Sequence, residues 1–335
     1  MDNVHVFLVN VWLVFIGLFL ALYVILDGFD LGIGVLSLFA RGEERRGIMV
    51  ASLSSVWDAN ESWLVVLGGA LFGAFPLAYG IILNALYLPL ISMLFALIFR
   101  GVAFEFREHS KGRRLWNYAF GIGSLMAAIC QGFALGGLIG APSVANGRFI
   151  GGPFDWLTPF SATVALGVAF GYVLLGSTYL IIKTEGEQQD HSVRHAWISG
   201  ALMLAAAAAI SVWTPFRYPF VEQKWFGHGL ISGFVIPPAF AVFCSAMLAR
   251  ALWKRYENAP FFWTIGIFLA SLTGLGASFY PFIVPTNVAA EAAASDSMTL
   301  VSMMLGIGML IPVMITYNAY QYLVFRGKVT GSGYG

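Results

Sequence analysis

The sequence predicts an all-α polytopic membrane protein with about nine transmembrane helices, and three observations support this fold class. Apolar residues make up 59% of the 335 residues and charged residues only 10%, whereas soluble domains average about 45–50% and about 25%. The chain also divides into nine apolar runs, each long enough for a membrane-spanning helix. Finally, Lys and Arg gather in alternate connections between these runs. Lipid is therefore expected to surround most of the protein surface.

The hydrocarbon core of a bilayer requires roughly 20 apolar residues per helix, and runs this long and continuous are not barrel strands. The nine predicted spans are Val6–Leu38, Ile48–Phe75, Leu77–Phe99, Trp116–Ile139, Phe160–Ile182, Ala196–Trp213, Ile231–Trp253, Phe261–Val284 and Leu300–Val324. The first run is too long for a removable signal peptide, so we expect it to be a span. Because the connections are short, residues 1–335 are expected to form a single integral membrane domain.

Prolines divide into two groups. Several mark the ends of predicted spans: Pro76, Pro142, Pro159, Pro215 and Pro285. Others fall inside spans and predict kinks or local unwinding, because proline removes a helix hydrogen bond: Pro89, Pro237, Pro238 and Pro312.

The positive charges predict the orientation in the membrane. Of the 18 Lys and Arg residues, all but Arg148, Arg217 and Lys224 fall on one side of the nine-span arrangement. Cytoplasmic loops carry the excess of Lys and Arg in membrane proteins. We therefore expect the N-terminus outside and the C-terminus in the cytoplasm.

Four acidic residues fall inside predicted spans, where an ionisable group costs about 2.5–3.5 kcal/mol. Asp27 and Asp30 belong to the first span, and Asp58 and Glu61 to the second. The i, i+3 spacing puts each pair on one helix face. At 1.5 Å per residue, both pairs lie roughly 15–20 Å from the cytoplasmic end. The sequence therefore predicts one shared polar cluster that is reached from the cytoplasm.

Such a cluster is suited to holding protons. Buried carboxyl groups can exchange protons near neutral pH, because burial and neighbouring like charges oppose their ionisation. Arg100, predicted where the third span meets the cytoplasm, is a counter-ion or a point of proton uptake. Asn60, Asn84 and Gln131 are further polar residues within spans and could extend a hydrogen-bonded path. The alternative is that the carboxylates only pair with Arg or backbone groups and fix helix packing.

The residues around these acids are expected to serve packing. Gly28 and Gly32, together with Gly68 and Gly69, predict close approach of neighbouring helices. Trp57 and Trp63 flank the second acidic pair and are expected to be packing or interface anchors rather than redox groups.

The histidines and the net charge argue against other kinds of site. All five histidines fall at span ends or in connections: His5, His109, His191, His195 and His228. This chain is therefore not expected to ligate haem by itself, and no metal site is predicted. The net charge of +1 gives no general attraction for nucleic acid.

Two segments carry a specific family resemblance. Asp27–Gly34, which reads DGFDLGIG, and Val56–Leu64, which reads VWDANESWL, resemble subunit II of the cytochrome bd-type quinol oxidases, including their cyanide-insensitive branch. The resemblance continues at Phe279–Pro285 and Val324–Val329, and it covers nearly the whole chain in order. It implies a fold of two four-helix bundles plus one peripheral helix, in the bacterial cytoplasmic (inner) membrane.

The resemblance also implies a function. Members of the family oxidise quinol and reduce oxygen to water, and the haem b and haem d or b-type groups belong to subunit I. The resemblance implies that Asp58 is the main proton relay. Together with the acidic cluster described above, it makes Glu61 a neighbour of this relay and Asp27, Asp30 and Arg100 the rest of the inner path. Beside subunit I, quinol and lipid, the resemblance allows a bound quinone and a small single-span accessory subunit as partners. Ala59 and Thr286–Asn287 depart from the family pattern, which puts helix approach and outer-loop contacts there in question.

Two other functions remain compatible with these residues. A proton- or cation-coupled secondary transporter would bind its ion on the carboxylates, although nine spans do not split into equal inverted repeats. A purely structural assembly subunit would need Asp58 for haem content or complex yield, rather than for turnover.

Overall fold

A computed structural model describes residues 3–110, 112–227, 233–330 and 333–334. The predicted span start at Ile231, as well as Lys111 and His228, lies outside these residues. The longer helices are α1 (Asn3–Phe39), α3 (Trp57–Ala74), α5 (Tyr87–His109), α6 (Arg113–Ile139), α7 (Pro159–Lys183), α8 (Gly186–Arg217), α10 (Ile236–Trp253), α11 (Ala259–Phe279) and α13 (Ser297–Val324). The shorter helices are α2 (Glu43–Ala51), α4 (Pro76–Ala85), α9 (Pro219–Phe226), α12 (Ala290–Ala293) and the 3-10 helix η1 (Gly233–Val235).

In the part of the chain that the structure describes, sheet structure is limited to three short antiparallel hairpins in the connections and the C-terminal segment. Their strands are β1 (Val144–Ala145) with β2 (Arg148–Phe149), β3 (Phe282–Val284) with β4 (Val288–Ala289), and β5 (Val329–Thr330) with β6 (Gly333–Tyr334). The all-α fold class that the sequence predicts is therefore confirmed.

Within the described residues, eight helices are long and apolar enough to cross a membrane: α1, α5, α6, α7, α8, α10, α11 and α13. Nine spans were predicted, and the one that does not reappear among these eight helices corresponds to α3. It has 18 residues, and its first two turns carry Asp58, Asn60 and Glu61, which lower its apolar content. The division into two four-helix bundles and one peripheral helix stays a prediction.

The second and third predicted spans are each broken in the structure. Turns at residues 52–56 separate α2 from α3, and the hydroxyl groups of Ser52 and Ser54 there donate to backbone carbonyls three residues earlier. Such local bonds compete with a continuing helix. The third span breaks at Leu86, because the ring of Pro89 would clash with the carbonyl of Ala85, the last residue of α4.

Two helices continue beyond their predicted ends. The third span was predicted to end at Phe99, but α5 runs on to His109. The connection between the predicted spans Phe160–Ile182 and Ala196–Trp213 is helical from Gly186, where α8 begins. Polar residues extend both helices past the apolar run, which hydropathy alone does not detect.

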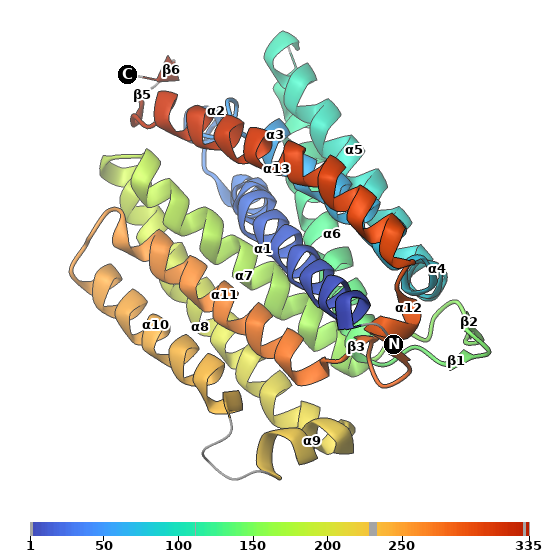
Figure 1. Ribbon diagram of the computed structural model, residues 1–335. Coiled ribbons are helices and arrows are strands. Elements are labelled where there is room, and N and C mark those ends of the chain that lie inside the picture. The colour runs from blue at the N-terminus through green and yellow to red at the C-terminus, as the bar shows by residue number, and fades with distance from the viewer. Residues whose placement is uncertain (1–2, 111, 228–232, 331–332, 335) are drawn as a thin grey trace.

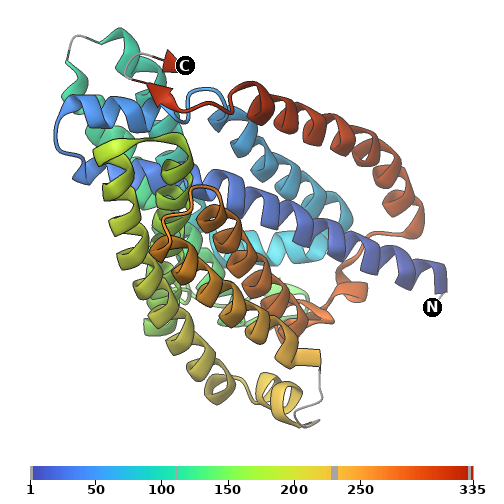
Figure 2. The same cartoon turned by 90° about the vertical axis from the view of Figure 1, so that its left-hand side faces the viewer.

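Helix α1 occupies the centre of the molecule. It packs against α3 and α6 on one side and against α7 on another, and α11 and α13 also contact it. In Figure 1, α13 crosses in front of the other helices, whereas α7, α8, α10 and α11 form the opposite half of the molecule. Figure 2 shows the C-terminal hairpin beside α2, in agreement with the contacts between β5 and α2. The first span is therefore the scaffold on which the polar residues are arranged.

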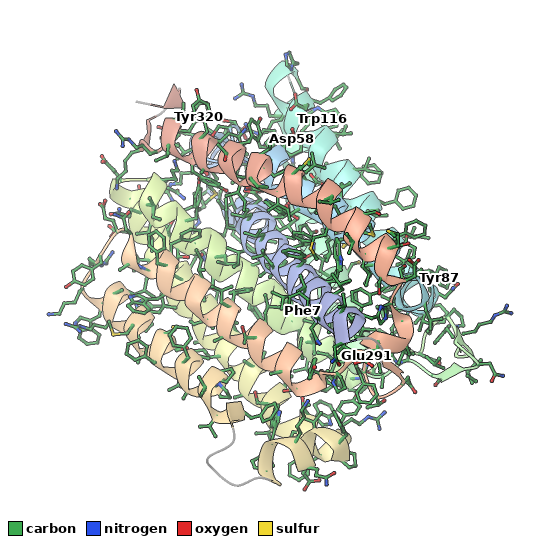
Figure 3. The ribbon with its side chains drawn as sticks, in the orientation of Figure 1. Phe7, Asp58, Tyr87, Trp116, Glu291 and Tyr320 are labelled. Carbon is green, nitrogen blue, oxygen red and sulfur yellow. The ribbon has the colours of Figure 1, made fainter. Side chains whose placement is uncertain are left out.

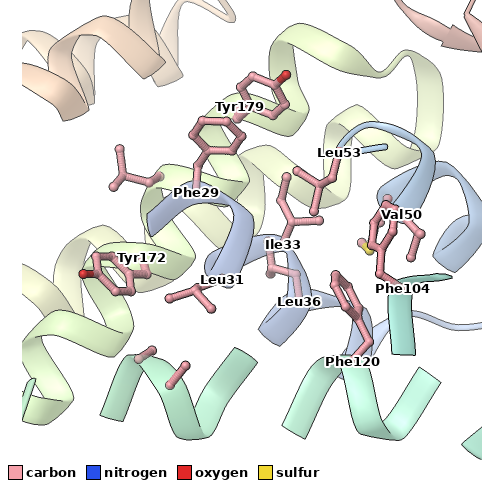
Figure 4. Close-up of a cluster of buried hydrophobic side chains, with 14 of the residues drawn as sticks. Phe29, Leu31, Ile33, Leu36, Val50, Leu53, Phe104, Phe120, Tyr172 and Tyr179 are labelled. Atoms are coloured by element: carbon pink, nitrogen blue, oxygen red, sulfur yellow. The ribbon is translucent and has the colours of Figure 1, made fainter. Parts of the chain in front are cut away.

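The contact between α1 and α7 is unusually close because both helices carry glycine there. A Cβ atom built at Gly32 would lie 1.8 Å from the carbonyl oxygen of Tyr172, and one at Gly176 would lie 2.6 Å from the backbone nitrogen of Ile33. The ring of Phe29 stacks on that of Tyr179, with 4.2 Å between centroids, in the buried cluster of Figure 4. By contrast, Cβ atoms at Gly68 and Gly69 would meet no atom within 4 Å, so no described helix of this chain makes the close approach predicted there.

A charged contact fixes α2 against the ends of α5 and α6. Arg107 Nη2 donates to Glu43 Oε1 at 2.6 Å, and Asn117 Nδ2 donates to Glu43 Oε2 at 2.8 Å. Partial burial raises the pKa of Glu43, but the hydrogen bond from Asn117 and the Arg107 guanidinium outweigh it and hold the pKa below its ordinary value.

The lowered pKa of Glu43 predicts a pH dependence for the anchoring of α2. The pKa of the Glu43 carboxyl is lower in the folded protein than in the unfolded chain. Its ionised form therefore stabilises the contact fully at pH values above the unfolded-state pKa, and this stabilisation is lost as the pH falls through the folded-state pKa. The effect should stay below about 1 kcal/mol, because the carboxylate is partly exposed. We expect proteolysis near α2 to speed up from pH 6 to pH 4 and Glu43→Gln to abolish this change. A rate independent of pH in the unaltered protein would contradict the prediction.

Candidate functional site

Three helices bring a buried ionic cluster together. Asp27 and Asp30 come from α1, Arg100 from α5 and Asn60 from α3. Arg100 Nη1 donates to Asp27 Oδ1 at 2.7 Å, and Arg100 Nη2 lies 3.6 Å from Asp30 Oδ2. The guanidinium therefore stands between the two carboxylates.

The cluster is sealed within the chain. Asp27, Asp30, Asn60 and Arg100 are each at most 2% exposed. Among the described residues, Asp27 Oδ2 and Asp30 Oδ1 have no hydrogen-bond partner. The single positive charge of Arg100 balances only one of the two carboxylates. A proton bound to the other carboxylate would neutralise the remaining negative charge. The arrangement can therefore hold an exchangeable proton.

Asn60 connects the cluster to the last long helix. Its Nδ2 group donates to Asp30 Oδ2 at 3.0 Å, and its Oδ1 atom accepts from the hydroxyl of Tyr322 on α13 at 2.8 Å. The sequence indicated Asn60 but not Tyr322. A single aromatic residue near the end of an apolar run carries no signal that it reaches a residue 262 positions earlier.

A second polar group joins three helices next to Asp27. Gln131 Nε2 on α6 donates to the hydroxyl of Tyr23 on α1 at 2.6 Å, and the hydroxyl of Tyr172 on α7 donates to Gln131 Oε1 at 2.5 Å. Gln131 therefore extends a hydrogen-bonded group within the spans. Asn84, by contrast, is exposed and donates to the carbonyl of Gly80 within α4.

The second acidic pair is split between the buried cluster and the surface of the chain. Glu61 is half-buried and close enough to Arg100 and Asp27 to interact with them electrostatically. Asp58 is exposed on the outer face of α3, so the four acids do not form the single enclosed cluster that the spacing predicts. Figure 3 labels Asp58 towards the end of the molecule where Tyr320 and Trp116 also lie.

The helix ends set the depth of the site. Asp30 lies nine residues before Phe39, the last residue of α1, and therefore about 13 Å from that end. Arg100 lies nine residues before His109, and therefore also about 13 Å from the end of its helix. Asp58 precedes Asn60 by two residues in α3 and so lies at a similar depth.

The tryptophans and glycines surround the acids as packing residues. The ring of Trp57 packs against Phe104 at 5.3 Å between centroids, and Trp63, which is 1% exposed, stacks on Phe19 at 6.1 Å. Gly28 leaves room for the ring of Tyr172, which a Cβ atom there would approach to 2.8 Å.

The described residues contain no group of three His, Cys, Asp or Glu placed to hold a metal ion. His191 is hydrogen-bonded, because its Nε2 atom lies 3.0 Å from Arg45 Nη1, and Glu187 forms ion pairs with both side chains. This contact joins α2 to the beginning of α8 and lies outside the ionic cluster.

Known proteins resemble this chain along almost its whole length. The sequence model of a family described as cytochrome bd terminal oxidase subunit II matches residues 8–325. Subunit 2 of the cytochrome bd-I ubiquinol oxidase of Escherichia coli K12 is 27% identical, over 96% of this chain and 94% of the relative. Subunit 2 of the cytochrome bd ubiquinol oxidase of Bacillus subtilis 168 is 26% identical, over 96% of each chain.

A solved structure shares the fold. A chain of the bd oxidase from Geobacillus thermodenitrificans superimposes with a TM-score of 0.75, covering 92% of this chain and 97% of that one at 18% identity.

Proposed function

Because the chain belongs to the family of subunit II of the cytochrome bd terminal oxidases, we propose that it conducts protons from the cytoplasm to its partner, the haem-bearing subunit I. The protein is thus a multi-pass membrane subunit of a bd-type oxidase, an enzyme complex in which subunit II works with subunit I. The haem groups supply the chemistry of oxygen reduction, which consumes protons. We place these groups in subunit I and propose no ligand for them on this chain.

One observation carries this proposal: Asp58 is an exposed carboxylate on α3, two residues from Asn60, which contacts the buried Asp30. The side chain of Asp58 faces outward from α3. An ionisable group facing lipid costs about 2.5–3.5 kcal/mol, so such groups face protein or water. We infer that subunit I covers this face of α3 and that Asp58 lies at the contact between the two subunits.

The path we propose runs along α3. Asp58 takes a proton on its carboxylate and passes it towards the partner. Glu61, one turn further along α3, exchanges protons with the buried group of Asp27, Asp30 and Arg100. Burial and the one-cation, two-acid composition support this part of the path, because they let the cluster store a proton.

The remaining parts of the assembly follow from the family. We propose that the N-terminus lies outside and the C-terminus in the cytoplasm of a bacterial inner membrane, in keeping with the distribution of Lys and Arg. Quinol as electron donor, a bound quinone, surrounding lipid and a small single-span accessory subunit are further proposals for the complex.

Replacing Asp58 by Asn tests the function in the assembled oxidase. We expect oxygen consumption with added quinol to fall by about tenfold per haem-loaded complex, because the amide cannot carry the proton and only slower routes remain. Turnover is normalised to haem content, measured from the optical spectrum. Glu44→Gln, at an exposed carboxylate of α2, makes the same charge change and should leave turnover unchanged.

Two results would overturn the proposed function. Unchanged turnover of the Asp58→Asn complex with full haem content would remove Asp58 from proton transfer. A lower haem content or yield with unchanged turnover per haem would instead identify a purely structural role.

A further inference from the structure

Among the described residues, one neutral donor, the Asn60 amide, hydrogen-bonds to the side chain of the buried acid Asp30, so the orientation of that amide matters. With Nδ2 turned to Asp30, the amide donates to the carboxylate at 3.0 Å. Turned the other way, the amide would present its oxygen to the carboxylate, and two acceptors would face each other. Asn60 is 0% exposed, so solvent does not decide between the two orientations.

The hydroxyl of Tyr322 holds the other end of the amide. It donates to Asn60 Oδ1 at 2.8 Å and so anchors the amide in the orientation in which Nδ2 faces Asp30. The donor comes from α13, whose membrane segment is only 6% buried within this chain. Tyr322 and Asn318 are among the few residues of this helix that turn a polar group inward.

Contacts near both ends hold α13 where Tyr322 meets Asn60. Near its beginning, Trp12 Nε1 on α1 donates to the carbonyl of Leu300 at 3.1 Å. At its end, the buried ammonium group of Lys183 on α7 donates to the carbonyl of Phe325 and lies 3.4 Å from that of Gly327. Because both ends are fixed, the position of the Tyr322 hydroxyl is set by the fold rather than by local packing alone.

We propose that Tyr322 is a positioning residue of the proton path, which holds the Asn60 amide on Asp30 and thereby controls how readily Asp30 takes up and releases a proton. This inference rests on the proposed function. It adds α13 to a path otherwise built from α1, α3 and α5. Tyr322 itself does not need to carry a proton.

The test uses Tyr322→Phe in the complete oxidase complex, because phenylalanine keeps the ring and removes only the hydroxyl. We expect quinol-driven oxygen consumption per haem to fall by about threefold to tenfold. This is the fold-change that corresponds to the free energy of one neutral hydrogen bond. A carboxylate without its donor keeps its proton to higher pH. The alkaline limb of the pH profile of turnover should therefore move up by about half a unit to one unit.

Two comparisons make the result specific. Tyr320→Phe removes an exposed hydroxyl two residues away on the same helix, where 64% of the residue is accessible, and should change neither turnover nor the pH profile. In an Asn60→Ala background, Tyr322→Phe should add no further loss, because interacting residues are not additive in a double-mutant cycle.

The outcomes separate this inference from the function on which it rests. If Asp58→Asn lowers turnover while Tyr322→Phe leaves both turnover and the pH profile unchanged, the positioning role is overturned and the proton path stands. A loss of haem content with an unchanged pH profile would also overturn it, as a structural effect. If Asp58→Asn and Asp30→Asn are both without effect, the proposed function and this inference fail together.

Discussion

Replacement of Arg100 by Leu should leave almost no assembled oxidase in the membrane. The change removes the only cation that the structure shows in contact with Asp27 and Asp30, which are both at most 1% exposed. Removing one partner of a buried ion pair costs about 3–5 kcal/mol, which is a large part of the roughly 5–15 kcal/mol that typically stabilises a protein. The measurement is the yield of haem-loaded complex and its thermal unfolding in detergent.

A charge-neutral variant distinguishes the electrostatic explanation from lost packing. Combining Arg100→Leu with Asp27→Asn and Asp30→Asn removes the cation and both carboxylates together. A buried ionic group replaced as a whole often costs little, whereas a broken one is strongly destabilising. We therefore expect the triple variant to recover much of the yield without recovering turnover. If Arg100→Leu alone keeps a normal yield and melting temperature, the ion pair does not stabilise the fold.

Adding one methyl group at Gly32 should be similarly damaging. The Cβ atom of Gly32→Ala would lie 1.8 Å from the carbonyl oxygen of Tyr172, so α1 and α7 would have to separate. Overpacking of a core typically costs about 1–3 kcal/mol and can exceed this when backbone must move. Because α1 also carries Asp27 and Asp30, we expect loss of both stability and haem-loaded complex.

A second glycine on the same helix provides the control. A Cβ atom at Gly17 would meet no atom within 4 Å, so Gly17→Ala should keep the yield and the unfolding temperature of the complex. The two variants add the same atom to the same helix and differ only in what surrounds it. Equal stability of Gly32→Ala and Gly17→Ala would show that the two helices can move apart freely.

Much of the fold could be predicted because lipid imposes long apolar runs. Eight of the nine predicted spans correspond to helices that are apolar enough to cross the membrane. The breaks at residues 52–56 and at Leu86 were missed because each lies inside a segment that hydropathy predicts as one span. Hydropathy reports the solvent around a segment, and it does not report where the backbone bends.

The site could be predicted only in part. The spacing of Asp27 and Asp30 correctly places them on one face of α1, and both meet Arg100. The exposure of Asp58 could not be predicted in the same way. The i, i+3 spacing shows that Asp58 shares a helix face with Glu61, but it does not show whether that face points into the protein. The partnership of Tyr322 with Asn60 depends on how α13 crosses α3, which no local pattern records. The roles of these residues in proton transfer stay predictions.

The hydrogen bond between Tyr322 and Asn60 also has a consequence for biosynthesis. The two residues are separated by 262 positions, and ribosomes add about 5–20 residues per second. Asn60 therefore enters the membrane roughly 10–50 s before its hydroxyl partner has been translated. During that interval the nascent chain holds a buried acid whose amide donor is not yet fixed. Docking of α13 is thus the step at which a newly made subunit acquires its finished interior.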